Sequence, residues 1–410
     1  MSIIFPTLNY VAKDYLNDSN GKPLSLTFTR ATSAYRSNSI GLLESVSSGI
    51  LRHDYDSVTG EYKGWIAEES RTNELLYSES ANNASTIGNI TISSNSTKSP
   101  GGTNTADTMT DSIDASPSYH YISHGYSQSG GTTTRCFSSF VKAGPHDKIR
   151  LTVGGNSSGQ YHLDVNLTSA TVAATSSGGG AVVASGIYPV GDGWYRAWIA
   201  GTLTAGDTAA EARVVITNTA GNTTYQGAGA LSVYIWGRVY ETGTFPTSYI
   251  QTTTSSVTRN TDVLSISTSS FGFNPLEGTL LFIGDIPDAS NRTILALGTT
   301  ATTETIEMNI GGGIIQMSVK VSNVSQASIS SGSSPSINTK FSAAIAYKVN
   351  DFAICVNGGS VSIDSSGNVP IVDTLYIGAN YIYQPNGGHI RHIAYFPRRL
   401  SNSDLQSITT

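Results

Sequence analysis

The feature that most constrains this chain is an alternation of apolar and polar residues with a period of two. Clear examples lie at residues 24–28, 149–153 and 231–235. Successive side chains of a β-strand point to opposite faces, so this period predicts strands with one buried face. Turn sequences rich in glycine, such as Gly-Asp-Gly at 191–193, separate the runs. The pattern therefore predicts an all-β protein built of sandwiches or barrels, with one short helix near 401–408.

The length and the composition suit several folded domains. A chain of 410 residues is long enough for two or three β domains. Only 13% of the residues are charged, against about 25% in typical soluble domains, and Ser, Thr, Asn and Gly take their place. The 38% of hydrophobic residues, with 21 Tyr and 11 Phe, exclude a disordered chain. Such an uncharged polar surface is typical of extracellular or virion β-proteins.

Charge and hydropathy exclude two kinds of partner. The formal net charge of −6 and the lack of a dense Lys/Arg run argue against nucleic-acid binding. No run of about 18 apolar residues exists, so no membrane insertion is expected. The first residues lack the features of a signal peptide, and Cys136 and Cys355 are expected to stay reduced in separate domains. An exterior type of surface without an export signal fits a particle assembled in the host cytoplasm.

The chain divides into three predicted units. Residues 1–78 are richer in charge and form a β-rich attachment or interdomain unit. Residues 79–258 are rich in Ser, Thr and Gly, and Phe245-Pro246 ends their last strand because proline cannot donate to a sheet. Residues 262–410 follow a polar linker at 252–256. No repeat of about 20–50 residues is present, which argues against propellers and solenoids.

The N-terminal unit resembles a segment that recurs in phage tail and other virion-surface proteins. The resemblance rests on these runs: Phe28-Thr29-Arg30-Ala31-Thr32, Arg52-His53-Asp54-Tyr55-Asp56, Gly64-Trp65-Ile66 and Arg71-Thr72-Asn73. Trp65 stands where an aliphatic residue is usual, and it keeps the position apolar. The resemblance implies that Arg30, Arg52 and Arg71 form structural ion pairs with the acidic residues of this unit, Asp54 and Glu68 among them.

The other two units resemble known sandwich folds. Residues 140–144, 191–196 and 245–250 resemble the jelly-roll carbohydrate-binding modules of the same phage proteins. Residues 277–280 and 388–401 resemble concanavalin-like and laminin-G-type domains. The resemblance implies tandem β-sandwiches, a jelly roll followed by a concanavalin/laminin-G-like domain, after the small N-terminal unit.

Aromatic residues are the candidates for carbohydrate binding, because exposed rings stack on sugar faces. Three sets stand out: Tyr119, Tyr121 and Tyr126; Trp194 and Trp198; Tyr381 and Tyr383. The alternative for every set is that the rings pack inside a sandwich or between subunits.

The sequence predicts no catalytic residues, no metal site and no cofactor. A glycosidase needs two carboxylates across a cleft, and Asp54/Asp56 and Glu68/Glu69 are expected to serve structure instead. Laminin-G-type domains often bind calcium, but the acidic residues of the third unit are scattered. His389 and His392 lie three apart on a predicted strand, so they face opposite sides and cannot share a metal ion.

These features together predict a non-enzymatic bacteriophage virion surface protein: a tail fibre, receptor-binding or capsid-decorating protein. Its expected partners are host surface glycans and other virion proteins, and the resemblance implies a homo-oligomer, commonly a homotrimer. Many copies on a particle would make weak sugar contacts effective. Two alternatives are a purely structural decoration or assembly protein and a polysaccharide-degrading tail enzyme.

Overall fold

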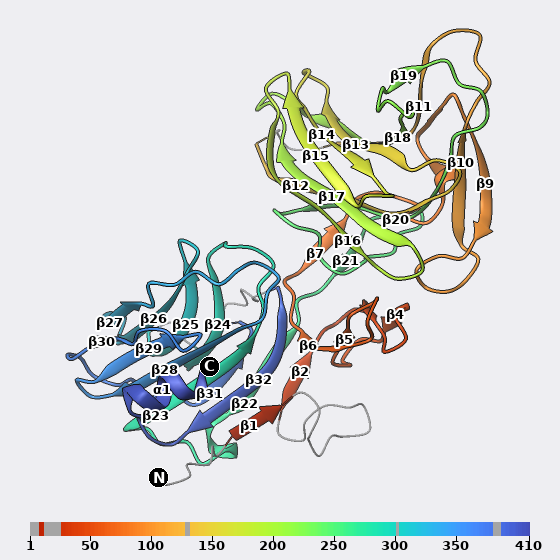
Figure 1. Cartoon of the computed structure of the whole chain (residues 1–410). Helices are drawn as coiled ribbons and strands as arrows, with labels where there is room; N and C mark the ends of the chain where they lie inside the picture. Colours follow the sequence, from red (N-terminus) through yellow and green to blue (C-terminus); the bar gives the residue numbers. More distant parts are fainter. Residues whose placement is uncertain (1–7, 12–25, 128–131, 301–302, 380–386) are drawn as a thin grey trace.

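The computed structural model describes residues 8–11, 26–127, 132–300, 303–379 and 387–410. Within these ranges every strand pairing is antiparallel, and the main sheets pack in pairs as two sandwiches (Figure 1). The predicted all-β sandwich fold is confirmed. The described ranges contain no helix long and apolar enough to cross a membrane.

The middle sandwich consists of two sheets, named here after their central strands. The β12 sheet has the order β16 (Ala181–Pro189), β17 (Trp194–Thr202), β12 (Arg135–Ala143), β20 (Ser232–Thr242), β10 (Ala106–Asp111) and β9 (Ile90–Thr97). The β13 sheet has the order β15 (Thr171–Ser177), β14 (Gln160–Asn166), β13 (Lys148–Gly155), β18 (Ala209–Ile216), β11 (Ser118–Ser127) and β19 (Thr224–Tyr225), with β8 (Thr86–Gly88) also on β11. A short 3-10 turn, η1 (Ala81–Asn83), precedes β8. Alternate residues of both sheets, such as Ile199 and Leu151, form one buried core between them.

The C-terminal sandwich also has two sheets around one core. The β23 sheet has the order β30 (Ser362–Asp364), β29 (Phe352–Val356), β28 (Phe341–Lys348), β23 (Glu277–Gly284), β32 (His389–Phe396), β6 (Tyr62–Ile66) and β5 (His53–Tyr55), with β1 (Leu8–Val11) also on β32. The β24 sheet has the order β2 (Thr27–Thr29), β22 (Val263–Ser267), β31 (Thr374–Ile377), β24 (Arg292–Gly298), β25 (Thr305–Gly311), β26 (Ile314–Val321) and β27 (Val324–Ser330). The helix α1 (Asn402–Ile408) is capped by Ser401, whose hydroxyl accepts from the Asp404 N–H.

The N-terminal segment is built into the C-terminal sandwich. Strands β1, β2, β5 and β6 extend its two sheets, although more than 180 residues of chain separate β6 from β22. The hairpin of β3 (Ala34–Ser37) and β4 (Leu43–Val46) instead covers part of the middle sandwich, where Tyr35 and Leu43 pack near Trp236 and Tyr249. The division into units at residues 78, 258 and 262 remains a prediction, because whether each unit folds separately is a property of the chain in solution.

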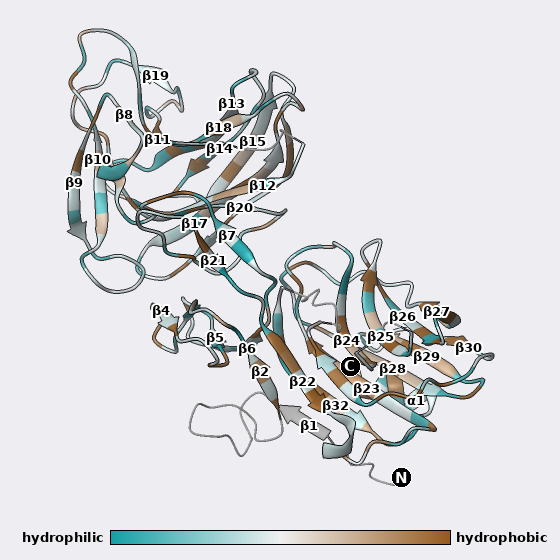
Figure 2. Ribbon diagram, turned by 180° about the vertical axis from the view of Figure 1, so that it is seen from behind, coloured by the Kyte–Doolittle hydropathy of each residue, from teal (hydrophilic) through white to brown (hydrophobic). Residues whose placement is uncertain are grey.

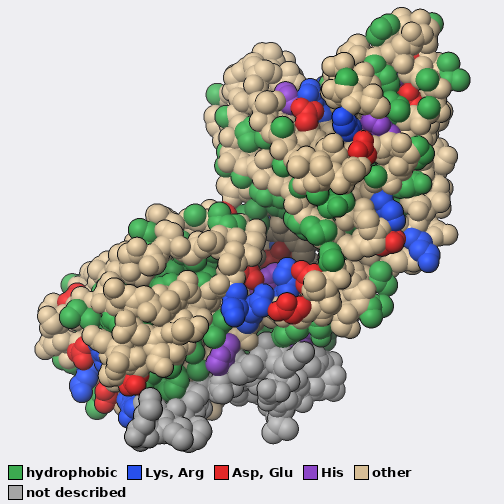
Figure 3. Space-filling view, viewed as in Figure 1, with side chains coloured by type: hydrophobic (Ala, Val, Ile, Leu, Met, Phe, Trp, Pro, Cys, Tyr) green, Lys and Arg blue, Asp and Glu red, His purple; other side chains and the backbone are tan. Residues whose placement is uncertain are grey.

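A short ladder joins the two sandwiches. Strand β7 (Arg71–Asn73) leads into the middle sandwich and β21 (Val257–Arg259) leads out of it, and the two pair with each other. Figure 2 shows brown, hydrophobic bands on the strands of both sandwiches and teal on β7 between them. In Figure 3 charged side chains are sparse, and a dense mixed group of them lies at the waist between the sandwiches.

The waist contains a buried ionic cluster, in which three arginines surround two carboxylates. Arg52 Nη1 lies 2.9 Å from Glu68 Oε2, and Arg52 Nη2 pairs with Asp262. Arg30 Nη1 lies 3.0 Å from Asp262 Oδ1, and Arg259 Nη1 lies 3.0 Å from Glu68 Oε2. Burial would raise the pKa of Glu68, but Arg259 and Arg52 outweigh it and hold that pKa well below its ordinary value.

The ion pairs expected from the sequence occur only in part. Arg52 contacts Glu68, and Arg71 contacts Glu69, with 2.5 Å between Nη2 and Oε1. Arg30 and Asp54 take partners from outside the N-terminal unit, Asp262 and His389 respectively. The reason is that the chain returns to the waist after the middle sandwich and brings these distant partners with it.

His389 forms a second ionic link at the start of β32. Its Nδ1 lies 3.0 Å from Asp285 Oδ1, and its Nε2 lies 2.9 Å from Asp54 Oδ2. Burial would lower the pKa of His389, but the two carboxylates outweigh it and raise that pKa to about 9. The imidazolium therefore ties β5 to the end of β23.

We expect Asp262→Asn to lower the free energy of unfolding by about 3–5 kcal/mol, because it leaves Arg30 buried without a counter-charge and Arg52 with Glu68 alone. Urea unfolding measures the loss. The control is Glu44→Gln, which breaks the half-exposed pair with Arg36 and is expected to cost less than about 1 kcal/mol. Equal losses in the two variants would contradict the role given to the waist.

Alkaline pH is expected to weaken the His389 link. The folded-state pKa of about 9 lies above the ordinary 6.5, so the stabilisation is complete below pH 6.5 and is lost as the pH rises through about 9. The free energies of unfolding of the wild type and of His389→Gln, measured across this range, should converge as the pH increases. A difference that stays constant with pH would refute the charged link.

Candidate functional site

The two outer faces of the middle sandwich differ in what covers them. On the β12 sheet, Phe140, Trp194 and Trp236 pack with Tyr249 into a small buried cluster. On the β13 sheet, the outward side chains of β14 are half-exposed and those of β15 are exposed. The outer face of the β13 sheet is therefore the part of this sandwich that can meet a ligand, and we call it the polar face. Its central residues are Tyr119, Tyr121, Ser123, Arg150, Thr152, His162, Asp164, Glu211 and Arg213.

Strand register brings these residues together in rows across the sheet. Tyr121 lies opposite Val215, which lies opposite Arg150, which in turn lies opposite Asp164. The next row runs through Ser123, Arg213, Thr152 and His162. Residues directly opposite on antiparallel strands have Cβ atoms about 5 Å apart, so each row is continuous.

Two arginine–carboxylate pairs lie on the polar face. Arg150 binds Asp164 with both oxygens, at 2.7 Å from Nε to Oδ1 and 2.8 Å from Nη2 to Oδ2. Arg213 donates from Nε at 2.9 Å and from Nη2 at 2.5 Å to a single oxygen, Oε2 of Glu211. Both pairs are partly exposed, with 22% of the Arg150 and 32% of the Arg213 side chain accessible. Burial would raise the pKa of Glu211, but the bonds from Arg213 outweigh it and lower that pKa.

Two tyrosines border these pairs. The rings of Tyr119 and Tyr121 meet edge to face, with 5.7 Å between centroids. Tyr121 lies against Gly88 of β8, where a Cβ atom would come within 2.4 Å of the ring. Arg213 Cζ lies 5.7 Å from the centroid of the same ring. Because Gly88 has no side chain, the Tyr121 ring can pack against the backbone of β8 next to Arg213.

Thr152 lies between Arg213 and His162 in its row. Only 3% of the residue is exposed, and its hydroxyl has no hydrogen-bond partner among the described residues. His162 Nε2 bonds the Thr175 hydroxyl, and burial, helped by Arg150, lowers the pKa of His162. The imidazole is therefore neutral at neutral pH, and the Thr152 hydroxyl is a buried polar group that no described residue satisfies.

The structure does not bring the predicted aromatic residues to one place. Tyr119 and Tyr121 lie on the polar face. Tyr126 points into the core, 3.9 Å from Tyr240 between ring centroids, and Trp194 is 1% exposed on the covered outer face, so neither ring is open to a sugar. Trp198 is half-exposed on the outer face of the β12 sheet, over Gly186. Tyr381 and Tyr383 lie outside the described residues.

Sequence reasoning missed the charged and polar part of the polar face. Arg150 and Thr152 alternate with buried Leu151 and Val153, and His162 and Asp164 alternate in the same way with buried residues. The period of two therefore indicated one polar side for each strand. The sequence pattern could not indicate that the polar sides of neighbouring strands lie side by side on one face of the sheet, because that depends on the order of the strands.

Neither a metal centre nor a free carboxylate pair is evident in the described ranges. They hold no group of three His, Cys, Asp or Glu side chains that could bind a metal ion. The carboxylates considered for catalysis have other contacts: Asp54 bonds His389, Asp56 accepts the N–H groups of Val58 and Thr59, and Glu68 bonds the arginines of the waist.

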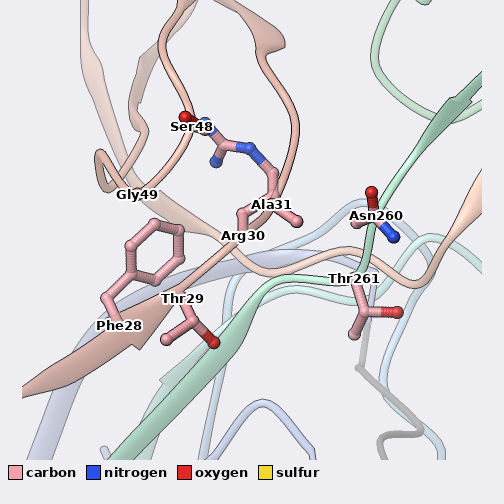
Figure 4. Close-up of a pocket in the computed structure, with 8 residues that line it drawn as sticks. All are labelled: Phe28, Thr29, Arg30, Ala31, Ser48, Gly49, Asn260 and Thr261. Atoms are coloured by element: carbon pink, nitrogen blue, oxygen red, sulfur yellow. The ribbon is translucent and has the colours of Figure 1, made fainter.

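A shallow hollow at the waist is a weaker candidate (Figure 4). Its lining consists of Phe28, Thr29, Arg30, Ala31, Ser48, Gly49, Asn260 and Thr261. Arg30 is the charged member, and its guanidinium already donates to Asp262 and to the carbonyl of Ser47. The hollow therefore offers less polar chemistry than the polar face.

The chain shows distant structural likenesses to known proteins. No family model and no curated protein sequence matches the chain. The carbohydrate-binding module of a Ruminococcus gnavus sialidase, bound to α2,6-sialyllactose, is 14% identical over 33% of this chain and 85% of its own, with a TM-score of 0.30. Domains LG4–5 of the mouse laminin α1 chain are 11% identical over 71% and 95% respectively, with a TM-score of 0.24. These values assign no ligand to the present chain.

The Thr152 hydroxyl on the polar face can be tested by substitution, because it has no hydrogen-bond partner among the described residues. We expect Thr152→Val to keep the free energy of unfolding within about 1 kcal/mol of the wild type, because it removes a buried polar group without breaking a bond. Ser123→Ala is the control, since it breaks the hydrogen bond to Glu211 and is expected to cost about 1 kcal/mol. A large loss in Thr152→Val would show that the hydroxyl has a structural partner.

Proposed function

We propose that this protein is a non-enzymatic bacteriophage virion surface protein, a tail fibre, receptor-binding or capsid-decorating protein, that attaches to host surface glycans through the polar face. The virion part of the proposal is supported by the motifs of the N-terminal unit, Arg52-His53-Asp54-Tyr55-Asp56 and Arg71-Thr72-Asn73 among them. The glycan part is supported by the geometry of the β13 sheet.

The observation that carries the glycan proposal is the meeting of aromatic rings with donors and acceptors on one accessible sheet face. Tyr119 and Tyr121 offer ring surface, and the Arg150 and Arg213 pairs lie beside them. Sugar recognition combines ring contacts with directed hydrogen bonds, since a pyranose has an apolar face and a rim of hydroxyls.

The proposed partners follow from this arrangement. One sheet face makes a weak contact with a glycan, so attachment needs several copies, and a homotrimer displayed many times on a particle would supply them. Other virion proteins would hold the chain in place, and the virion surface is its proposed location.

A purely structural role is the second candidate, and the N-terminal unit favours it. Ile40 and Val58 are 77% and 59% exposed at the tips of two turns. The turns touch, since a Cβ on Gly41 would lie 2.3 Å from the Ser57 carbonyl oxygen. Exposed aliphatic residues on adjoining turns suit a contact with another protein better than a contact with a sugar.

The test is binding of the purified full-length chain to host surface polysaccharide and to a glycan array. We expect Tyr121→Ala to weaken binding about tenfold, or about 1.4 kcal/mol, because a ring of the platform is lost. Tyr188→Ala is the matched control, since Tyr188 lies on β16 of the other sheet.

The outcomes separate the candidates. Binding that Tyr121→Ala weakens and Tyr188→Ala preserves supports the polar face. Binding that only Trp198→Ala weakens would move the site to the β12 sheet. If the oligomeric protein binds no glycan at high concentration, the structural role replaces attachment.

A further inference from the structure

We infer that the polar face takes an uncharged glycan, bound along an internal stretch of its chain rather than by an acidic or a terminal sugar. The inference rests on the proposed function and adds the class of ligand. Three features of the face carry it: the balance of its charges, the mixture of free donors and acceptors, and its breadth.

The first feature is that each arginine already has a counter-charge in contact. Asp164 takes the charge of Arg150 and Glu211 takes that of Arg213. Lys148, at the edge of the face, donates to the Thr219 carbonyl, and His162 is neutral at neutral pH. A carboxylate or sulfate on a sugar would have to displace Asp164 or Glu211, and would meet their repulsion. Charge balance therefore disfavours acidic glycans.

The second feature is the hydrogen-bonding capacity that the pairs leave open. Glu211 accepts the bonds from Arg213 and from Ser123 at Oε2, so among the described residues Oε1 remains an open acceptor. Arg213 donates to Glu211 from Nε and Nη2, so its Nη1 remains a free donor as far as the described residues are concerned. Sugar hydroxyls also donate and accept, whereas a carboxylate only accepts, so neutral sugars match this set.

The third feature is the shape of the face. The rows run from β11 through β18 and β13 to β14, three strand spacings, or about 14 Å. A hexopyranose within a chain is about as long as one strand spacing. The rows therefore fit an internal stretch of about three sugar residues lying across the strands.

The experiment uses the full chain on an array of neutral and acidic glycans, followed by calorimetry with a length series of the neutral glycan that binds. We expect neutral glycans to bind and the affinity to increase from disaccharide to about the tetrasaccharide and then level off. We also expect the affinity to change less than about twofold between low and high salt, because no net charge is neutralised. Capping the terminal sugar should leave binding unchanged.

Two variants make the test specific. Tyr119→Ala, which removes the ring that packs edge to face on Tyr121, should weaken binding of the neutral glycan about tenfold. Glu211→Gln should free the charge of Arg213 and strengthen binding of acidic glycans at least about fivefold, with a new dependence on salt. Tyr188→Ala on the other sheet is the control for both.

Each contrary outcome has a distinct meaning. Salt-sensitive binding of acidic glycans by the wild type, or affinity that is complete with one terminal sugar, would overturn this inference and leave glycan attachment standing. Wild-type behaviour of both Tyr119→Ala and Glu211→Gln would also overturn it. Absence of binding to every glycan would overturn the proposed function itself.

Discussion

The contact of Arg52 with Glu68 and Asp262 is the interaction on which the arrangement of the two sandwiches depends. It joins residues before the middle sandwich to residues after it, and Ser248 at the end of that sandwich donates to Glu68 from both its N–H and its hydroxyl. A buried charge is tolerated only when its partners are in place. The cluster is therefore satisfied in one arrangement of three chain segments, and this requirement selects how the sandwiches meet.

Much of the fold could be predicted from local patterns, because those patterns report burial. In β17, for example, Trp194 and Arg196 alternate with Ala197 and Ile199 in the sequence, and the structure has the two pairs on opposite sides of the sheet. Long-range pairing could not be predicted in the same way. The Arg30–Asp262 contact spans 232 residues, and the pairing of β6 with β32 joins the first strands to the last. Neither contact can be inferred from the pattern of about ten consecutive residues.

The candidate site shows the same limit. Tyr119 and Tyr121 are two apart on one strand, so their shared side follows from the sequence. The pairing of Arg150 with Asp164 depends on the register of β13 against β14, and the position of Arg213 depends on β18 lying between β11 and β13. Those choices are made by packing across the whole sandwich. The resulting face is mainly charged and hydroxylic, whereas sequence reasoning concentrated on aromatic residues.

The ladder of β7 and β21 has a consequence for how the chain is made. Val257 pairs with Asn73, so the chain leaves and re-enters the C-terminal sandwich at the same point, and the middle sandwich is a domain inserted into another. A ribosome releases all the strands of the inserted domain long before β32, on which β1, β6 and β23 depend. All the strands of the middle sandwich are therefore available to one another, while the earliest strands of the chain wait for the last one. The adjacent ends also make the inserted domain exchangeable, so that one scaffold could carry different recognition domains without rebuilding its own sheets.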